Sequence, residues 1–300
     1  ILSAQVPEIL SDQLAVAVPK NLKLETLQFT TAANDPAPRT WHVSTTGSNA
    51  NSGSSPEQAW RTIGHAAQQV APGDTVLIAG GTYSEQVIIP TTGDQDRPIT
   101  FRAKEGEPVY LDGKQRSLTR AFLLRGKSHI YFDGFQARGF GMPGGGRWPL
   151  QLAGVFNLYA GNDIRITRCF NDGRGGGYSA PMVQAWDVRN LQIKNCVAVA
   201  NAGAIRIRSC PDMVIENNVI LRSNTQNLVL SNQPEEKITI RNNILGDNQP
   251  SKSHVQTFEI RSAHSLLEGN NAYYFRIPDE ERKAFLFGDV GAELRRMGAA

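Results

Sequence analysis

Aromatic, arginine and acidic side chains recur at related positions of several short apolar strands between residues 122 and 261. Successive side chains of a strand alternate between its two faces, so inward apolar residues send their neighbours outward. The outward row is then Arg125, Tyr159, Trp186, Arg208, Ser231 and Arg261, with Arg206 and Glu259 beside it. Aromatic rings stack on the C–H surfaces of sugars, and guanidinium groups bind carboxylate or sulfate through paired hydrogen bonds. The row predicts a surface for an anionic glycan, unless Trp186 faces inward and the arginines are ordinary surface charges.

Two glycine-rich segments interrupt the strands close to this row. Residues 144–146 precede Trp148, and residues 175–177 lie between Arg174 and Tyr178. Long loops on one side of a repeat array often form its binding cleft. The predicted substrate-binding residues are therefore Tyr159, Trp186, Glu259, Trp148, Tyr178 and Arg174.

The chemistry that suits these residues is β-elimination at a uronate. That reaction needs charge neutralisation at the carboxylate, a base for the C5 proton and a proton for the leaving oxygen. The candidates for charge neutralisation are Arg206, Arg208 and Arg261, and the candidates for base or acid are Lys194, Lys252, His254 and Tyr178.

Hydrolysis of a glycosidic bond is the alternative reaction. It needs two carboxylic acids about 5 to 9.5 Å apart. Glu259 and Asp187 form the one pair that the strand pattern places near the same face. Elimination is the favoured reaction.

Acidic and amide residues in the turns are candidate ligands for Ca²⁺, which binds oxygen atoms. These residues are Asn171, Asp172, Asp187 and Asp247. Turns are also rich in Asn and Asp because these residues tolerate left-handed backbone conformations. The metal site therefore stays open.

A repeat positions all of these residues. Its second strands align as Phe132-x-x-Phe135, Ile166-x-x-Cys169, Ile193-x-x-Cys196, Ile215-x-x-Asn218, Ile240-x-x-Asn243 and Leu267-x-x-Asn270, with anchors 34, 27, 22, 25 and 27 residues apart. A repeat of this length indicates a solenoid, because one unit buries its apolar face only when a neighbour stacks on it. The strands are too closely spaced for βαβ units, so whole coils must stack in parallel.

Stacking of coils explains several polar residues without chemistry. Asn218, Asn243 and Asn270 share one position, which predicts an interior ladder of amides. Cys169 and Cys196 occupy the same position earlier in the array and are expected to be buried thiols. Lys194, Glu216, Arg241 and Glu268 alternate in sign on the outer face, which predicts a ladder of surface ion pairs.

The bulk composition excludes two classes of partner. The net charge of +3 over 300 residues, with basic and acidic residues mixed, does not suggest a nucleic-acid surface. No apolar run approaches the roughly 18 residues of a membrane span. The 28 glycines and 16 prolines suit a chain that turns every few residues.

The chain divides into three predicted parts. Residues 1–39 are expected to be a linker or extended arm, residues 40–275 the solenoid, and residues 276–300 a C-terminal cap or tail. A short helix is expected within residues 61–70, laid across the open end of the solenoid to cover its core. The chain starts at Ile1 without a Met and resembles a processed product or a piece of something longer.

An ordered set of motifs near the start of the solenoid carries a family resemblance. The motifs are Trp41-His42-Val43-Ser44-Thr45-Thr46-Gly47-Ser48-Asn49, Trp60-Arg61-Thr62-Ile63 with Ala66-Ala67, Pro72-Gly73-Asp74-Thr75-Val76 and Gly81-Thr82-Tyr83-Ser84-Glu85. With the later repeats, residues 40–275 resemble right-handed parallel β-helix proteins of the pectate-lyase-like superfamily. The resemblance implies an all-β, right-handed parallel β-helix with a short N-terminal capping helix.

The same resemblance implies a secreted or cell-surface protein that acts on polysaccharide. Several lyases of the superfamily use Ca²⁺ to neutralise a uronate carboxylate and a Lys or Arg as base, although no lyase signature matches this chain residue by residue. The leading expectation is a lyase on an acidic glycan. The alternatives are a non-catalytic carbohydrate-binding or structural module of a larger assembly, and a glycoside hydrolase.

Overall fold

The computed structural model describes residues 37–141, 153–174, 180–200, 203–223, 227–231, 237–246, 258–261 and 266–274. For residues 258–261, 266–268 and 272–274 the description covers the backbone. The expected arm, up to residue 36, and the expected C-terminal cap lie outside the described residues.

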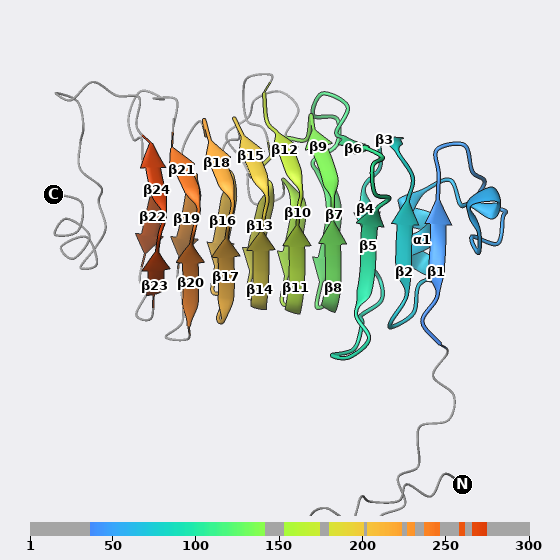
Figure 1. Cartoon of the computed structure of the whole chain (residues 1–300), viewed down its shortest axis with the longest axis horizontal. Helices are drawn as coiled ribbons and strands as arrows, with labels where there is room; N and C mark the ends of the chain where they lie inside the picture. Colours follow the sequence, from blue (N-terminus) through green and yellow to red (C-terminus); the bar gives the residue numbers. More distant parts are fainter. Residues whose placement is uncertain are drawn as a thin grey trace, which may run out of the picture. The chain divides into compact units, whose positions relative to one another are not determined.

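Three parallel sheets form the described part of the chain (Figure 1). The nine-stranded sheet contains, in spatial order, β1 (Thr40–Val43), β2 (Thr75–Ile78), β5 (Ile99–Ala103), β8 (Ser128–Asp133), β11 (Asn162–Thr167), β14 (Arg189–Lys194), β17 (Met213–Glu216), β20 (Ile238–Arg241) and β23 (Leu266–Gly269). The seven-stranded sheet contains β22 (Phe258–Arg261), β19 (Leu228–Ser231), β16 (Ile205–Arg208), β13 (Val183–Trp186), β10 (Gly154–Tyr159), β7 (Arg120–Arg125) and β4 (Val87–Ile88). The eight-stranded sheet contains β24 (Ala272–Tyr274), β21 (Ile244–Gly246), β18 (Val219–Leu221), β15 (Val197–Val199), β12 (Phe170–Asp172), β9 (Phe135–Arg138), β6 (Val109–Asp112) and β3 (Gly81–Tyr83).

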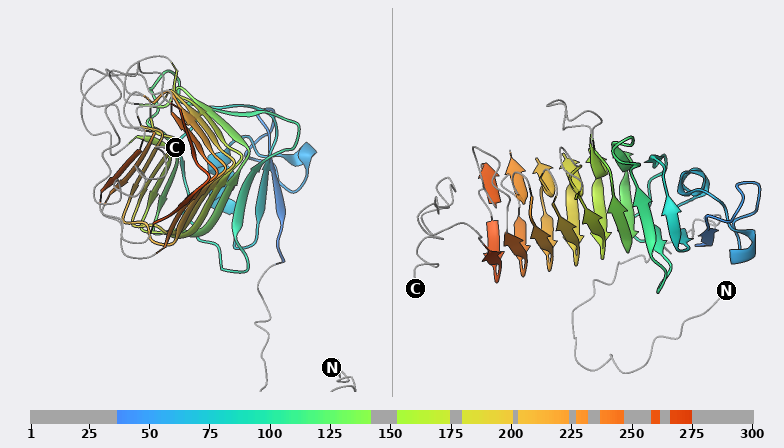
Figure 2. Two further views of the ribbon diagram at one scale, coloured as in Figure 1. Left: turned by 60° about the vertical axis from the view of Figure 1, so that its left-hand side comes forward. Right: turned by 90° about the horizontal axis from the view of Figure 1, so that it is seen from above.

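Each coil contributes one strand to each sheet, as β13, β14 and β15 do before β16, β17 and β18. The three sheets form the walls of one stack, and the strands of each wall lie side by side (Figure 2). This parallel β-helix is the architecture that the repeat predicts.

The described interior of the stack is mainly apolar. Phe122, Phe132 and Phe156 come from three strands and are at most 1% exposed. The ring centroids of Phe122 and Phe132 lie 4.6 Å apart, and those of Phe122 and Phe156 lie 5.6 Å apart. Later coils replace the rings with Ile and Leu, so the core is continuous from coil to coil.

Two-residue turns join the nine-stranded sheet to the eight-stranded sheet. The first residue of each turn has left-handed backbone geometry, with φ of 58° at Asn217, 55° at Asn242 and 54° at Asn270. Asn adopts this conformation more readily than most residues. The second residue of each turn points into the coil.

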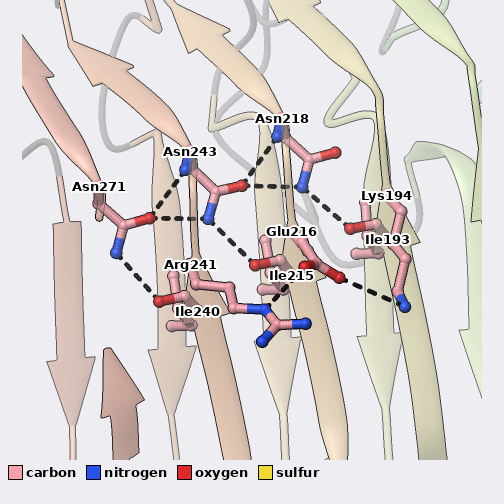
Figure 3. A network of polar contacts seen from close by, with 9 residues as sticks. All are labelled: Ile193, Lys194, Ile215, Glu216, Asn218, Ile240, Arg241, Asn243 and Asn271. Carbon is pink, nitrogen blue, oxygen red and sulfur yellow. Dashed lines mark hydrogen bonds and ion pairs between the residues drawn. The ribbon is translucent and has the colours of Figure 1, made fainter. Parts of the chain in front are cut away.

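The inward turn residues form the amide ladder shown in Figure 3. Asn243 Oδ1 accepts hydrogen bonds from the backbone N–H and from Nδ2 of Asn218, at 2.9 and 3.0 Å. Asn271 Oδ1 accepts the same pair from Asn243, at 2.9 and 3.0 Å. The predicted ladder is therefore correct for Asn218 and Asn243 and wrong for Asn270, because Asn270 is the exposed left-handed residue and Asn271 is the inward one.

A one-residue shift also removes Glu268 from the predicted ion-pair ladder. Glu216 pairs with Lys194 at 3.4 Å and with Arg241 at 2.7 Å, as predicted (Figure 3). Glu268, however, aligns with Ile240, and Gly269 aligns with Arg241. The sequence allows both registers because two leucines and two asparagines each stand side by side, at residues 266–267 and 270–271.

A short helix, α1 (Ile63–Gln69), packs on the first coil, and the 3-10 helix η2 (Pro56–Gln58) precedes it. Ile63, Ala66 and Ala67 are fully buried. Thr62 Oγ1 accepts a hydrogen bond from the backbone N–H of His65. The Glu85 carboxylate accepts hydrogen bonds from the backbone N–H groups of Ile63 and Gly64, at 2.9 and 2.8 Å. The predicted N-terminal capping helix is confirmed.

Two further expectations concern described residues. Cys169 and Cys196 are buried free thiols, as predicted from their stacked positions, and Cys210 is a third buried free thiol. Among the described residues no helix has the length and apolar character needed to span a membrane.

Candidate functional site

The seven-stranded sheet aligns the predicted outward residues in one row. Tyr159 of β10 is in register with Arg125 of β7 and with Trp186 of β13. The row continues through Arg208 and Ser231 to the backbone of Arg261. The residue before each member points inward: Leu124, Leu158, Ala185, Ile207 and Leu230 are at most 2% exposed. Trp186 is partly exposed, which excludes the alternative that it faces the core.

The aromatic members of this row hold one another in fixed orientations. The edge of one ring meets the face of the other between Tyr159 and Trp186, with centroids 5.5 Å apart and an interplanar angle of 86°. The Arg125 guanidinium carbon lies 5.3 Å from the centroid of the Tyr159 ring, a cation–π contact. The tyrosine is therefore fixed from both neighbouring strands.

A second outward row lies beside the first, two residues earlier on each strand. It aligns Leu123, Asn157, Gln184, Arg206, Val229 and the backbone of Glu259. The side chains of Asn157 and Gln184 are 0% and 2% exposed. Asn157 Nδ2 and Gln184 Nε2 each donate a hydrogen bond to Tyr159 Oη, and each donor lies 3.5 Å from this oxygen. We call the two rows together the β-helix face.

The described side chains of the β-helix face carry three positive charges, Arg125, Arg206 and Arg208, and no carboxylate. The exposed Asp187 follows Trp186 in the next turn, where its φ is 57°. Clustered guanidinium groups beside exposed aromatic edges attract an anionic ligand and give it a surface for stacking. The structure thus brings these arginine and aromatic residues onto one face, and binding of an anionic glycan there stays a prediction.

Other predicted site residues do not join the face. Lys194 lies on the nine-stranded sheet and pairs with Glu216, so the structure does not bring it together with Arg206 and Arg208. Arg174, after β12, donates to Asp172 at 2.6 to 3.0 Å, and these bonds hold the pKa of the Asp172 carboxyl below its usual range. We assign both residues to structural ion pairs.

Several predicted residues fall where the structure gives no side chain. Trp148, Tyr178, Lys252 and His254 lie outside the described residues, and Arg261 and Glu259 are described by backbone alone. Three strand spacings, roughly 14 Å, separate the strand of Glu259 from the strand before Asp187. The acid pair of Glu259 and Asp187 stays a prediction, because the structure describes only the backbone of Glu259.

The candidate calcium ligands that the structure describes do not converge. No group of three His, Cys, Asp or Glu side chains that could hold a metal ion occurs in the described ranges. Asp172 is bound to Arg174, Asn171 is buried, Asp187 is exposed on a different turn, and Asp247 lies outside the described residues. Calcium takes six to eight oxygen ligands, so the described members of this donor set do not by themselves fit it.

The sequence interpretation missed a second polar cluster, on the nine-stranded sheet. The Asp163 carboxylate accepts from Tyr131 Oη at 2.8 Å, from His129 Nδ1 at 3.0 Å and from Arg165 Nε at 3.0 Å. Burial opposes ionisation of Asp163, but these hydrogen bonds outweigh it and lower the pKa of the carboxyl. Burial together with Asp163 raises the pKa of Tyr131 to about 12. The sequence does contain a signal for this cluster. His129 and Asp163 occupy the same position in successive repeats, and Tyr131 and Arg165 each follow two residues later.

Comparison with known proteins identifies a family. A family model described as the Pel9A-like, right handed beta helix region matches residues 41–206, more than half of the chain. The handedness agrees with the prediction. An uncharacterised protein of Bacillus subtilis, YwoF, is 41% identical over 73 residues, which are 24% of this chain and 15% of YwoF.

Solved structures with the same fold include enzymes that act on polysaccharides and oligosaccharides. A rhamnogalacturonan lyase aligns with a TM-score of 0.57 and 17% identity, covering 77% of this chain and 62% of the lyase. Pectate lyase Pel9A aligns with a TM-score of 0.52 and 16% identity, covering 79% of this chain and 62% of the lyase. A lacto-N-biosidase of Eubacterium ramulus aligns with a TM-score of 0.56 and 10% identity, over 78% and 56% of the two chains. The chain thus spans less than two thirds of each of these proteins, and the likeness concerns the fold.

Proposed function

Because the chain belongs to the Pel9A-like right-handed β-helix family, we propose that it cleaves a uronate-containing polysaccharide by β-elimination. The observation that carries the proposal is the β-helix face, where Tyr159, Trp186 and Arg208 stand in register on adjacent strands. Strand spacing of about 4.8 Å places a new side chain at intervals similar to the length of one sugar unit. A glycan laid across the strands can contact one member of the row with each sugar.

Arg206 and Arg208 supply the charge that elimination requires. Both lie on β16 and point to the same side of the sheet, roughly 7 Å apart along the strand. When the C5 proton leaves, negative charge develops on the uronate carboxylate. A guanidinium group that donates two parallel hydrogen bonds stabilises this charge more in the transition state than in the bound substrate.

Trp186 supplies the stacking surface beside these charges. It is in register with Arg208, so the Cα atoms of the two residues lie about one strand spacing apart. A sugar next to the uronate would place its C–H face on the indole, which fixes the position of the carboxylate. Orientation of this kind lowers the barrier by reducing the entropy lost at the reacting centre.

A non-catalytic carbohydrate-binding module is the second candidate. It is favoured by the lack of a converging acid pair among the described residues and by the part coverage of the enzymes with this fold. Such a module would use the same arginines and aromatics to bind, without a proton-transfer group. We further propose a secreted or cell-surface location, where polysaccharide is available to either kind of protein.

The test is incubation with pectate, rhamnogalacturonan, alginate and glycosaminoglycans, with ultraviolet detection of the unsaturated uronate product. Each polymer is tested with Ca²⁺ and with EDTA, and we expect cleavage in both because the described charged side chains of the face are cations. Arg208→Ala should abolish cleavage while Arg241→Ala, on the other sheet, should not. A flat trace for the wild type with every polymer would refute the lyase and leave the binding module, which affinity electrophoresis on the same polymers would detect.

A further inference from the structure

The Tyr159 hydroxyl belongs to the first row of the β-helix face and contacts two residues of the second row. Its own strand supplies one amide donor, Asn157, and the next strand supplies another, Gln184, each 3.5 Å from Oη. In this geometry the phenol oxygen accepts from both neighbours. Two amide donors therefore fix the position of this oxygen.

The two amides are buried although they stand on the outward side of the sheet. A buried amide is costly unless its groups are hydrogen-bonded, so an apolar residue would serve stability at least as well at these positions. Along the same row, Leu123 and Val229 stand at the equivalent positions of β7 and β19. The two amides are thus confined to the strand of Tyr159 and to one of its two neighbours.

The backbone beside Asn157 makes room for its amide. A Cβ atom added to Gly154 would lie 2.2 Å from Asn157 Oδ1 and 3.3 Å from Gln184 Cβ. No side chain can occupy position 154 without displacing Asn157. Glycine here keeps the amide under the phenol.

The ring of Tyr159, like its hydroxyl, contacts side chains of neighbouring strands. Trp186 contacts it from β13, and the Arg125 guanidinium contacts it from β7. Arg125 and Arg208 add positive charge along the same row. A fixed ring, two amide donors and adjacent cations are the conditions under which a tyrosine exchanges protons with a substrate.

We propose that Tyr159 is the catalytic proton-transfer residue of this site and that Asn157 and Gln184 are positioning residues for its hydroxyl. The inference rests on the proposed elimination. The phenolate takes the C5 proton, the C5–H electron pair forms the C4=C5 double bond, and the C4–O bond breaks. The phenol then returns the proton to the leaving oxygen, so that Tyr159 is regenerated and no other reactant is consumed.

The first test is Tyr159→Phe, which removes the hydroxyl and keeps the ring. We expect kcat on the polymer that the wild type cleaves to fall by about 10²-fold or more, with glycan affinity changed by less than about threefold. Tyr131→Phe, on the nine-stranded sheet, is the matched control and should keep kcat. A Tyr159→Phe protein with more than about a tenth of wild-type kcat would overturn the inference and leave the lyase proposal standing.

The second test reads proton transfer directly from the pH profile of kcat. Gln184→Glu places a negative charge beside Oη and should move the rising limb to higher pH, whereas 3-fluorotyrosine placed at position 159 should move it to lower pH. Gln184→Leu is the neutral control, for which kcat should fall without a shift of the limb. If the limb stays in place in both the Glu and fluorotyrosine proteins, the inference is wrong. If the wild type cleaves none of the polymers, both the inference and the lyase proposal fail.

Discussion

Replacing Asn243 with alanine tests whether the amide ladder holds the C-terminal coils together. Asn243 is 1% exposed, and its side chain takes part in four hydrogen bonds within the ladder of Figure 3. Two are accepted from Asn218, one is donated to the Ile215 carbonyl at 3.0 Å, and one is donated to Asn271 Oδ1 at 3.0 Å. Alanine removes all four and fills none of the space between the coils.

The expected loss follows from these four bonds. A buried hydrogen bond contributes about 1 kcal/mol net, and a buried polar group left without a partner costs about 1 to 3 kcal/mol. Four bonds therefore give a loss of about 4 kcal/mol in the free energy of unfolding. Asn242→Gly is the matched control, because Asn242 is exposed with φ of 55° and glycine adopts this conformation without strain. Its stability should change by less than about 0.5 kcal/mol.

Equilibrium urea denaturation gives the free energy, and hydrogen–deuterium exchange locates the change. The backbone N–H of Asn218 donates to Asn243 Oδ1, so its protection should fall in the alanine variant. The N–H of Cys196, which donates to Asn218 Oδ1 one coil earlier, should lose less protection. A loss below about 1 kcal/mol, or unchanged protection at Asn218, would refute the view that the ladder is a major source of stability.

Three further predictions concern the sheets and the face. The pKa of Asp163 is lowered from 3.8, so its stabilising effect is full above the usual carboxyl range and is lost as the pH falls through the lowered value. Thermal melting from about pH 7 to pH 3 should therefore show a steeper fall for the wild type than for Asp163→Asn, and parallel curves would contradict this. Trp186→Ala should weaken binding of uronate oligomers about tenfold by calorimetry, whereas Tyr110→Ala on the eight-stranded sheet should not; equal affinities would exclude stacking on Trp186. Gly154→Ala should lower kcat with little change in KM, because the methyl group displaces Asn157 from Tyr159; an unchanged kcat would separate Asn157 from turnover.

The sequence predicts the strand register correctly where the repeat allows only one alignment. Phe132, Ile166, Ile193, Ile215 and Ile240 are successive partners in the nine-stranded sheet, as their shared spacing predicts. Prediction failed at the last coil, where paired leucines and paired asparagines permit two registers. In the observed register, Asn270 has the left-handed backbone conformation and Asn271 directs its amide inward.

The outward row of the seven-stranded sheet was also within reach of the sequence. Period-two alternation beside Leu158, Ala185 and Ile207 is enough to place Tyr159, Trp186 and Arg208 on one side, because stacked coils repeat the same register. Alternation along a strand does not show how the outward faces of two different sheets lie relative to each other. For that reason Lys194, on the nine-stranded sheet, was grouped with arginines that lie on another wall of the stack.

The sequence by itself determined the stacked coils, their apolar interior and the residues of each outward row, since these follow from side-chain alternation and from burial. Only the tertiary structure shows which neighbouring side chains each outward residue contacts. Tyr159 directs its hydroxyl to two buried amides, and Asp163 gathers a histidine, a tyrosine and an arginine. Such contacts depend on rotamers and on the lateral packing of neighbouring coils, which a repeat of residue types does not encode.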